Sequence, residues 1–289
     1  MSDEIMRVLS PGFGASLQDR GRVGWRRFGV PWGGCMDEHA AAWANRLLDN
    51  PSSCPVVELL WQGASFEMLR DAWIAVTGAN TEATVPMWRA LRINQGESIH
   101  FRHNCSGRWT YLAIEGGFFA ATFLGSASAY PRGGLGSNLK AGETLRRVPA
   151  KSFRLLPGVA GRLVPPHERR EYNHLPSFRV WPGKQWDLFA DPDRNRFFSE
   201  PWTVSPESDR VGYRLVGPPL ASRLNQIPSE PLRAGTIQVP ENGLPIVTMR
   251  DGPTVGGYPK LGMVDPRDLE WLTQCRPGQS VRFRPIDEP

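Results

Sequence analysis

The chain has 289 residues, 40% of them hydrophobic and 22% charged, a balance that excludes a disordered protein and allows a sizeable core. Lys and Arg number 34 against 29 Asp and Glu, so the net charge is +5. The basic residues are dispersed, which argues against nucleic-acid binding and is compatible with a small anionic substrate. No apolar run is long enough to span a membrane, and the acidic N-terminus does not resemble a signal peptide, so we expect a cytoplasmic protein without membrane contact.

The first half of the chain predicts short strands and one helix. Asp37 is placed to cap a helix near 38–48, with apolar residues on one face. The polar residues 104–107 are predicted to form a hairpin turn between two strands. The predicted strands of this half are 73–77, 98–103 and 109–115.

The second half repeats this mixture of short strands and few helices. Asp265 and Pro266 have the N-cap and first-position arrangement of a helix that ends before Pro277. A shorter helix is expected around 194–199. The predicted strands are 178–181, 212–216, 245–249 and 280–284.

The fold class predicted from these elements is mainly β with a few short helices, as a barrel or a sandwich. Residues 96–102 and 278–284 share the pattern Gly-x-Ser-aliphatic-x-Phe-Arg. We interpret this as two related β-rich modules, 1–170 with its helix and 171–289, although any turn before an amphipathic strand gives a similar pattern. The Pro-rich, charged segment 164–172 is the predicted linker.

The metal-binding residue types are scattered along the chain. Its four cysteines include no CxxC pair, and its five histidines form no motif with metal-ligand spacing. We therefore expect reduced cysteines and no metal. A P-loop, a GxGxxG fingerprint after a strand and a GxSxG elbow are also missing from the sequence.

Residues 235–260 are the most informative segment. Polar side chains alternate there with glycines, which permit close ligand approach, and with prolines, which fix the backbone. Such loops on a rigid scaffold commonly carry binding groups. The corners of a β-barrel need the same residue types, so a purely structural role remains the alternative. The polar residues of the segment include Gln238, Asn242, Asp251, Tyr258 and Lys260.

Two further groups of residues allow both a functional and a structural interpretation. Asp19, Arg20 and Arg22 lie on a glycine-punctuated turn and could clamp an anion or tie the turn together. Asp209 and Arg210 precede a strand, where they could bind a ligand or form a surface ion pair.

A series of motifs extends along nearly the whole chain, from about residue 7 to 286. They are Gln18-Asp-Arg-Gly-Arg-x-Gly, Gly29-Val-Pro-x-Gly-Gly-x-Met-Asp37, Ala44-Asn45, Thr77-Gly-Ala79, Ser208-Asp-Arg-x-Gly-Tyr-Arg-Leu215, Ser229-Glu230 and Gly235–Lys260. These motifs resemble the biotin-dependent carboxyltransferase family, also called allophanate hydrolase subunit 2. Members include the C subunit of the bacterial 5-oxoprolinase, an antagonist of a sporulation-kinase inhibitor, and the carboxyltransferase portion of urea carboxylase. The sequence departs from the family at Cys35, where Ala or Ser is usual, and at Val255, which replaces a Thr.

The resemblance implies a cyclophilin-like β-barrel architecture and a set of site residues. Catalytic positions carried over from the family are Lys260, Gln238 and Asn242. Substrate-binding positions are Arg210, Tyr258, Asp251 and Asp209. Structural or anion-binding positions are Gln18, Asp19, Arg22, Asp37 and Asn45.

Within the family, the chain is most similar to the C subunit of 5-oxoprolinase. This implies one component, inactive alone, of a complex that uses ATP to open the 5-oxoproline lactam to L-glutamate. The expected partners are a B-type 5-oxoprolinase chain (allophanate hydrolase subunit 1 family) and an A-type chain, with no covalently bound cofactor. One alternative is a carboxyltransferase of a urea or amide carboxylase, with biotin on another chain. Another is a regulatory protein that antagonises a kinase inhibitor.

Overall fold

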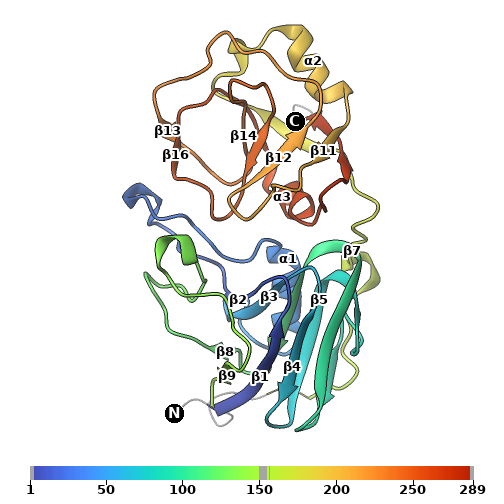
Figure 1. Cartoon of the computed structure of the whole chain (residues 1–289). Coiled ribbons are helices and arrows are strands. Elements are labelled where there is room, and N and C mark those ends of the chain that lie inside the picture. The colour runs from blue at the N-terminus through green and yellow to red at the C-terminus, as the bar shows by residue number, and fades with distance from the viewer. Residues whose placement is uncertain (1–2, 150–154, 156, 287–289) are drawn as a thin grey trace. The chain divides into compact units, whose positions relative to one another are not determined.

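The computed structural model describes residues 3–149, 155 and 157–286, and the chain divides into two compact units (Figure 1). Unit 1 comprises Met1–Arg22 and Gly33–Asn173, and unit 2 comprises Val23–Trp32 and His174–Pro289. The segment Val23–Trp32 therefore belongs with the second half of the chain, which a single boundary at residue 170 did not anticipate. In both units the fold is mainly β with short helices, so the predicted fold class is confirmed.

Unit 1 contains a nine-stranded sheet with the path β2-β3-β7-β4-β1-β9-β8, from which β5 and β6 branch through β7. Its apolar core includes Ile5, Phe66, Ile74 and Leu112, all fully buried. The strands are β1 (Asp3–Pro11), β2 (Ala15–Gln18), β3 (Val56–Leu60), β4 (Ala64–Met68), β5 (Ala72–Ala83), β6 (Ala90–Ile93), β7 (Ser98–Ile114), β8 (Phe118–Phe119) and β9 (Thr144–Arg147).

The predicted hairpin at 104–107 is wrong, because β7 runs through these residues as one strand. The first part of β7 pairs with β4, and its later part pairs with β3. On its other edge β7 pairs with β5 from Phe101 to Ile114. The pairing with β5 shifts register repeatedly around Asn80 and Thr81. The polar, glycine-containing stretch thus accommodates β-bulges that bend a long strand, and not a turn.

The predicted helix near 38–48 is confirmed as α1 (Glu38–Leu47), with Asp37 as its N-cap. The Ala40 amide donates to the Asp37 carboxylate at 3.0 Å, as an N-cap requires. Ala40 and Ala44 are fully buried, so this small-residue face lets the helix lie close to the sheet. The Thr77 hydroxyl of β5 also donates to the Ala40 carbonyl at 2.7 Å.

Residues 164–172 were predicted as a linker, but they belong to unit 1. Tyr172 is fully buried, and its hydroxyl donates to Asp37 at 2.8 Å. A charged, Pro-rich composition indicated an exposed connection, whereas contacts of Glu168, Arg170 and Tyr172 with α1 and its cap residue hold the segment on unit 1.

Unit 2 contains an eight-stranded sheet that curves into a nearly closed barrel, with the order β18-β11-β12-β15-β14-β17-β10-β19, and a separate ribbon of β13 and β16. The strands are β10 (Phe178–Pro182), β11 (Trp202–Val204), β12 (Gly212–Val216), β13 (Glu230–Pro231), β14 (Thr236–Gln238), β15 (Ile246–Thr248), β16 (Val255–Gly256), β17 (Lys260–Val264), β18 (Ser280–Val281) and β19 (Phe283–Pro285).

Two helices complete unit 2, α2 (Asp191–Ser199) and α3 (Pro266–Thr273), close to where they were predicted. Asp265 caps α3 by accepting from the Arg267 amide. Arg179 of β10 donates to both carboxylate oxygens of Asp268, at 2.8 and 2.6 Å, which fastens α3 to the sheet. The Arg267 side chain is the main reason that the pKa of Asp265 is lowered to about 2.

Substituting Gly78→Ala should destabilise unit 1 far more than Gly96→Ala. Both glycines have a positive φ, +89° and +84°, which costs an alanine about 1–2 kcal/mol. A Cβ at Gly78 would also lie 2.4 Å from the Trp109 carbonyl oxygen, whereas one at Gly96 would meet nothing within 4 Å. Urea unfolding should show a loss of about 3 kcal/mol or more for Gly78→Ala. Equal losses in the two variants would contradict this account.

Candidate active site in unit 2

Two strands of unit 2 bring Gln238 and Lys260 side by side. Gln238 ends β14 and Lys260 begins β17, and the two residues are register partners after a bulge that leaves Leu261 of β17 without a partner in the ladder. They are only 7% and 8% exposed. A bulge reorients a side chain relative to a regular strand, and it lies here at the position where these two polar groups meet.

The ammonium of Lys260 is held by the β13–β16 ribbon. Its Nζ donates to Glu230 Oε2 at 3.0 Å and to the Pro231 carbonyl at 3.1 Å. An ammonium has three N–H donors, and no described residue accepts the third one. Lys260 is thus a nearly buried cation with a fixed position and a donor to spare.

A tight turn supplies two more donors to the Glu230 carboxylate. Lys184 donates to Oε1 at 3.1 Å, and Gln185 Nε2 lies 3.3 Å from both oxygens. Gly183 places this turn against β17, because a Cβ there would lie 2.3 Å from the Lys260 carbonyl oxygen. The turn and the cation are therefore parts of one structure.

These contacts make Glu230 a strongly ionised carboxylate. Hydrogen bonds from Lys260 first, and then from Lys184, lower the pKa of Glu230 to about 2. The carboxylate consequently stays charged at any physiological pH. It gives Lys260 a permanent counter-ion.

The Gln238 amide is buried without a partner. Its Nε2 atom makes no hydrogen bond to any described residue, although most buried polar groups in proteins are paired. Gly256, the register partner of Glu230, packs against this amide, since a Cβ there would lie 2.6 Å from Nε2. An unpaired amide beside a glycine and a cation is suited to binding a ligand with an oxygen acceptor.

Asn242, predicted at the same site, lies elsewhere in unit 2. It is exposed on the turn after β14, where its side chain accepts from the Leu244 amide at 3.1 Å. It also lines a cavity of about 320 Å³ with α2 residues and residues 219–225, and neither Gln238 nor Lys260 lines that cavity. Although Asn242 follows Gln238 by only four residues, the two side chains are separated because the chain turns at Pro240.

The other predicted binding residues of unit 2 mainly hold its own backbone. Arg210 forms a bidentate ion pair with Asp251, with Nε–Oδ2 at 2.8 Å and Nη2–Oδ1 at 3.0 Å. Asp209 accepts from the amides of Val211 and Gly212 and so shapes the turn into β12. Tyr258 is 41% exposed, so its side chain is the one of this group that solvent reaches most easily.

In unit 1 the Asp19 turn forms a closed network of contacts. The Asp19 carboxylate accepts from the hydroxyls of Ser126 and Ser128, both at 2.6 Å, and from two backbone amides. Arg22 is buried and donates to the Ser128 carbonyl, and Gln18 donates to the Ala129 carbonyl at 3.1 Å. These side chains link distant loops of the unit, which favours the structural interpretation of this turn.

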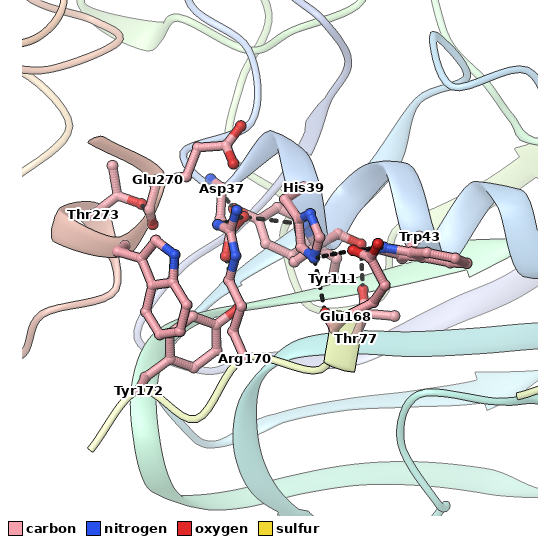
Figure 2. Close-up of polar contacts among 12 residues, drawn as sticks. Asp37, His39, Trp43, Thr77, Tyr111, Glu168, Arg170, Tyr172, Glu270 and Thr273 are labelled. Atoms are coloured by element: carbon pink, nitrogen blue, oxygen red, sulfur yellow. Dashed lines mark hydrogen bonds and ion pairs between the residues drawn. The ribbon is translucent and has the colours of Figure 1, made fainter. Parts of the chain in front are cut away.

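Asp37 lies in a second buried network of unit 1, shown in Figure 2. Its carboxylate accepts from Tyr172 and lies 3.5 Å from Arg170 Nη1, and its amide donates to the Tyr111 hydroxyl at 2.7 Å. Tyr111 donates in turn to Glu58, and burial, with Glu58 nearby, raises the pKa of this phenol well above its usual range.

Asn45 pairs with Asn50 and with the Cys54 carbonyl, at 3.1 and 2.9 Å, on the far end of α1. Both contacts fix the loop that follows the helix. Cys35 is buried and, like the other three cysteines, which all lie in the described part of the chain, forms no disulfide.

Glu230, Lys184 and Gln185 were not among the predicted site residues. Glu230 stands in the matching Ser-Glu motif, which was the one available signal for it. Gln185 lies 75 positions before Lys260 in a turn without a motif, so only the fold reveals it. Among the described residues no group of three or more His, Cys, Asp and Glu is arranged to hold a metal, and no helix is long and apolar enough to cross a membrane.

Comparisons with known proteins agree on one family. The family model for the carboxyltransferase domain, subdomains A and B, matches residues 28–285. The chain is 30% identical to the C subunit of 5-oxoprolinase from Escherichia coli K12, over 96% of this chain and 90% of that protein. The crystal structure of TTHA0988 matches with a TM-score of 0.88 and 33% identity over 97% of this chain and 55% of that one. The urea carboxylase of Kluyveromyces lactis matches with a TM-score of 0.90 and 26% identity, over 99% and 28%. This chain therefore spans only part of both solved chains.

Substituting Glu230→Gln should lower the free energy of unfolding at pH 7, because Lys260 loses its counter-ion. The pKa of Glu230 is about 2 when folded, against about 4.3 in an unfolded chain. Its stabilisation is thus present above pH ~4.3 and is lost as the pH falls through about 2.

Urea unfolding at a series of pH values checks this. The difference between wild type and Glu230→Gln should be constant from neutral pH to pH ~5 and then shrink. Lys184→Met, which removes a side chain that is 76% exposed, should have the smaller effect. A difference that persists at pH ~2 would show that charge on Glu230 is not its source.

Proposed function

The chain belongs to the carboxyltransferase domain family, subdomains A and B, and on this premise we propose that it is the C subunit of an ATP-dependent 5-oxoprolinase. The reaction opens the 5-oxoproline lactam to L-glutamate together with partner subunits. The observation that carries the proposal is a nearly buried cation, Lys260, beside the unpartnered amide of Gln238. The sequence similarity to a 5-oxoprolinase C subunit, which covers 90% of that protein, supports the choice of substrate.

In the proposed mechanism the chain positions the lactam and stabilises charge. Gln238 donates to the lactam oxygen and orients the ring. The third N–H of Lys260 meets the negative charge that grows on this oxygen as water attacks the carbonyl carbon. The ring C–N bond then breaks, and its nitrogen takes up a proton to become the amine of glutamate. Glu230 holds the ammonium in place before the reaction, so no reorganisation is needed at that step.

A five-membered lactam resists hydrolysis, and ATP used by the complex drives the ring opening. We place ATP binding on the partners, which are an A-type and a B-type 5-oxoprolinase chain. No biotin is needed in this reaction. The chain alone should therefore bind substrate without turning it over.

Carboxyl transfer to urea or a related amide is the second candidate, favoured by the likeness to the Kluyveromyces lactis urea carboxylase. There the Lys260 ammonium would stabilise a deprotonated amide nitrogen, and biotin would arrive on another chain. Both candidates place a small amide at the same cluster. They differ in the co-substrates that the complex uses.

Co-expression with candidate A-type and B-type partners separates the two reactions. Glutamate release from 5-oxoproline that depends on ATP supports the proposal, whereas avidin-sensitive bicarbonate fixation supports carboxyl transfer. Turnover of 5-oxoproline by the chain alone would refute the division of labour between the chains of the complex.

Two neighbouring glycines test the position of the substrate in this complex. A Cβ at Gly256 would lie 2.6 Å from Gln238 Nε2, whereas a Cβ at Gly257 would face the Ile227 carbonyl at 3.1 Å and Ser229 at 3.6 Å. Neither glycine has a positive φ, so alanine is compatible with both backbones. Gly256→Ala should lower the turnover rate roughly 100-fold by displacing the amide and the substrate.

Gly257→Ala is the matched control and should stay within about threefold of wild type. Thermal unfolding of both variants checks that neither loss reflects misfolding. Full activity of a folded Gly256→Ala variant would place the reaction away from Gln238.

A further inference from the structure

Gln185 contributes a second unpaired amide atom to the cluster around Glu230. Its Oε1 atom is buried and makes no hydrogen bond to any described residue. Its Nε2 atom faces both Glu230 oxygens. A carboxylate accepts only, so the nitrogen must face Glu230 and the oxygen must be the unpaired atom. Gln185 is thus a fixed acceptor.

Gln238 provides the complementary donor. The Nε2 atom of its amide is unpaired among the described residues, so this nitrogen is available to donate into the cluster. Both glutamines contact the β13–β16 ribbon. Gln185 contacts Glu230, and Gln238 contacts Gly256, the strand partner of Glu230. Within the described part of the chain, the cluster therefore offers one buried donor and one buried acceptor that lack a protein partner.

We propose that Gln185 and Gln238 together recognise a cis amide edge and so restrict the ligand to lactams, ureas and primary amides. This rests on the proposed function, because it takes the Lys260 cluster as the substrate site. In this assignment Gln238 donates to the ligand carbonyl oxygen, and Gln185 accepts the ligand N–H.

The chemistry of amides explains the restriction. In a small lactam the ring holds the amide cis, so the C=O and N–H groups lie on the same edge, and urea presents the same edge. An open-chain secondary amide is trans and turns these groups to opposite edges. An N-methyl lactam keeps the carbonyl but leaves the buried Gln185 oxygen unpaired, which costs affinity.

Gln185 is accordingly a specificity-determining residue and takes no part in bond breaking. Gly183 keeps its turn packed against the strand that carries Lys260. The same strand, β17, therefore positions both groups: the Gln185 oxygen that accepts the ligand N–H and the Lys260 ammonium that meets the ligand oxygen.

Calorimetric titration of the full-length chain with 5-oxoproline and with N-methyl-5-oxoproline tests the assignment. Wild type should bind 5-oxoproline roughly tenfold or more tightly. Gln185→Met keeps the length of the side chain and removes the acceptor. This substitution should reduce the preference for 5-oxoproline over the N-methyl ligand to about twofold or less, mainly by weakening the binding of 5-oxoproline.

Gln226→Met is the matched control, because it makes the same change at an exposed residue that lies outside the cluster. It should retain the wild-type preference. Thermal unfolding of each variant shows whether it is folded.

The outcomes separate this inference from the proposed function. If Gly256→Ala weakens 5-oxoproline binding, then equal binding of both ligands by wild type, or an equal loss of affinity for both in Gln185→Met, would overturn this inference and leave the proposed function standing. No binding of either ligand by wild type, or binding that a folded Gly256→Ala variant retains, would overturn the proposed function and this inference with it.

Discussion

The ammonium of Lys260 lies 3.0 Å from the Glu230 carboxylate in a β-rich unit, and the remaining features of the site depend on this ion pair. Desolvating two opposite charges is costly unless further hydrogen bonds satisfy them. Here Lys184, Gln185 and the Pro231 carbonyl provide those bonds. The pair thus holds a positive charge next to the Gln238 amide, whose nitrogen makes no hydrogen bond to any described residue. A mobile surface lysine would have to be ordered by the substrate at a cost in affinity.

The fold supplies the close approaches that this arrangement needs. The bulge before Gln238 brings it opposite Lys260, and Gly183 and Gly256 let a turn and a ribbon pack where a side chain would clash. Unit 1 uses its buried polar groups differently. Asp19 accepts hydrogen bonds from residues 126–128, and Asp37 accepts one from Tyr172, so each network ties two distant segments of the unit together.

How much the sequence revealed depended on whether a feature is local. Asp37 and Asp265 correctly predicted the helices that they cap, because an N-cap and the turn after it are adjacent in the chain. The sequence predicted Gln238 and Lys260 at one site because both stand in one segment with many family motifs. The sequence could not separate Asn242 from them, since spacing does not show where a chain turns. Glu230 is 30 positions from Lys260, and Gln185 is 75. The long strand β7 was predicted as a hairpin, because bulges and turns favour the same residues.

A crystal structure of the chain with bound 5-oxoproline would show whether Lys260 and Gln238 bind the substrate. We expect the ligand beside Gln238 and Lys260, with its lactam oxygen within about 3.2 Å of both Gln238 Nε2 and Lys260 Nζ. A ligand bound instead in the cavity lined by Asn242, with the Gln238 amide still unpaired, would contradict it.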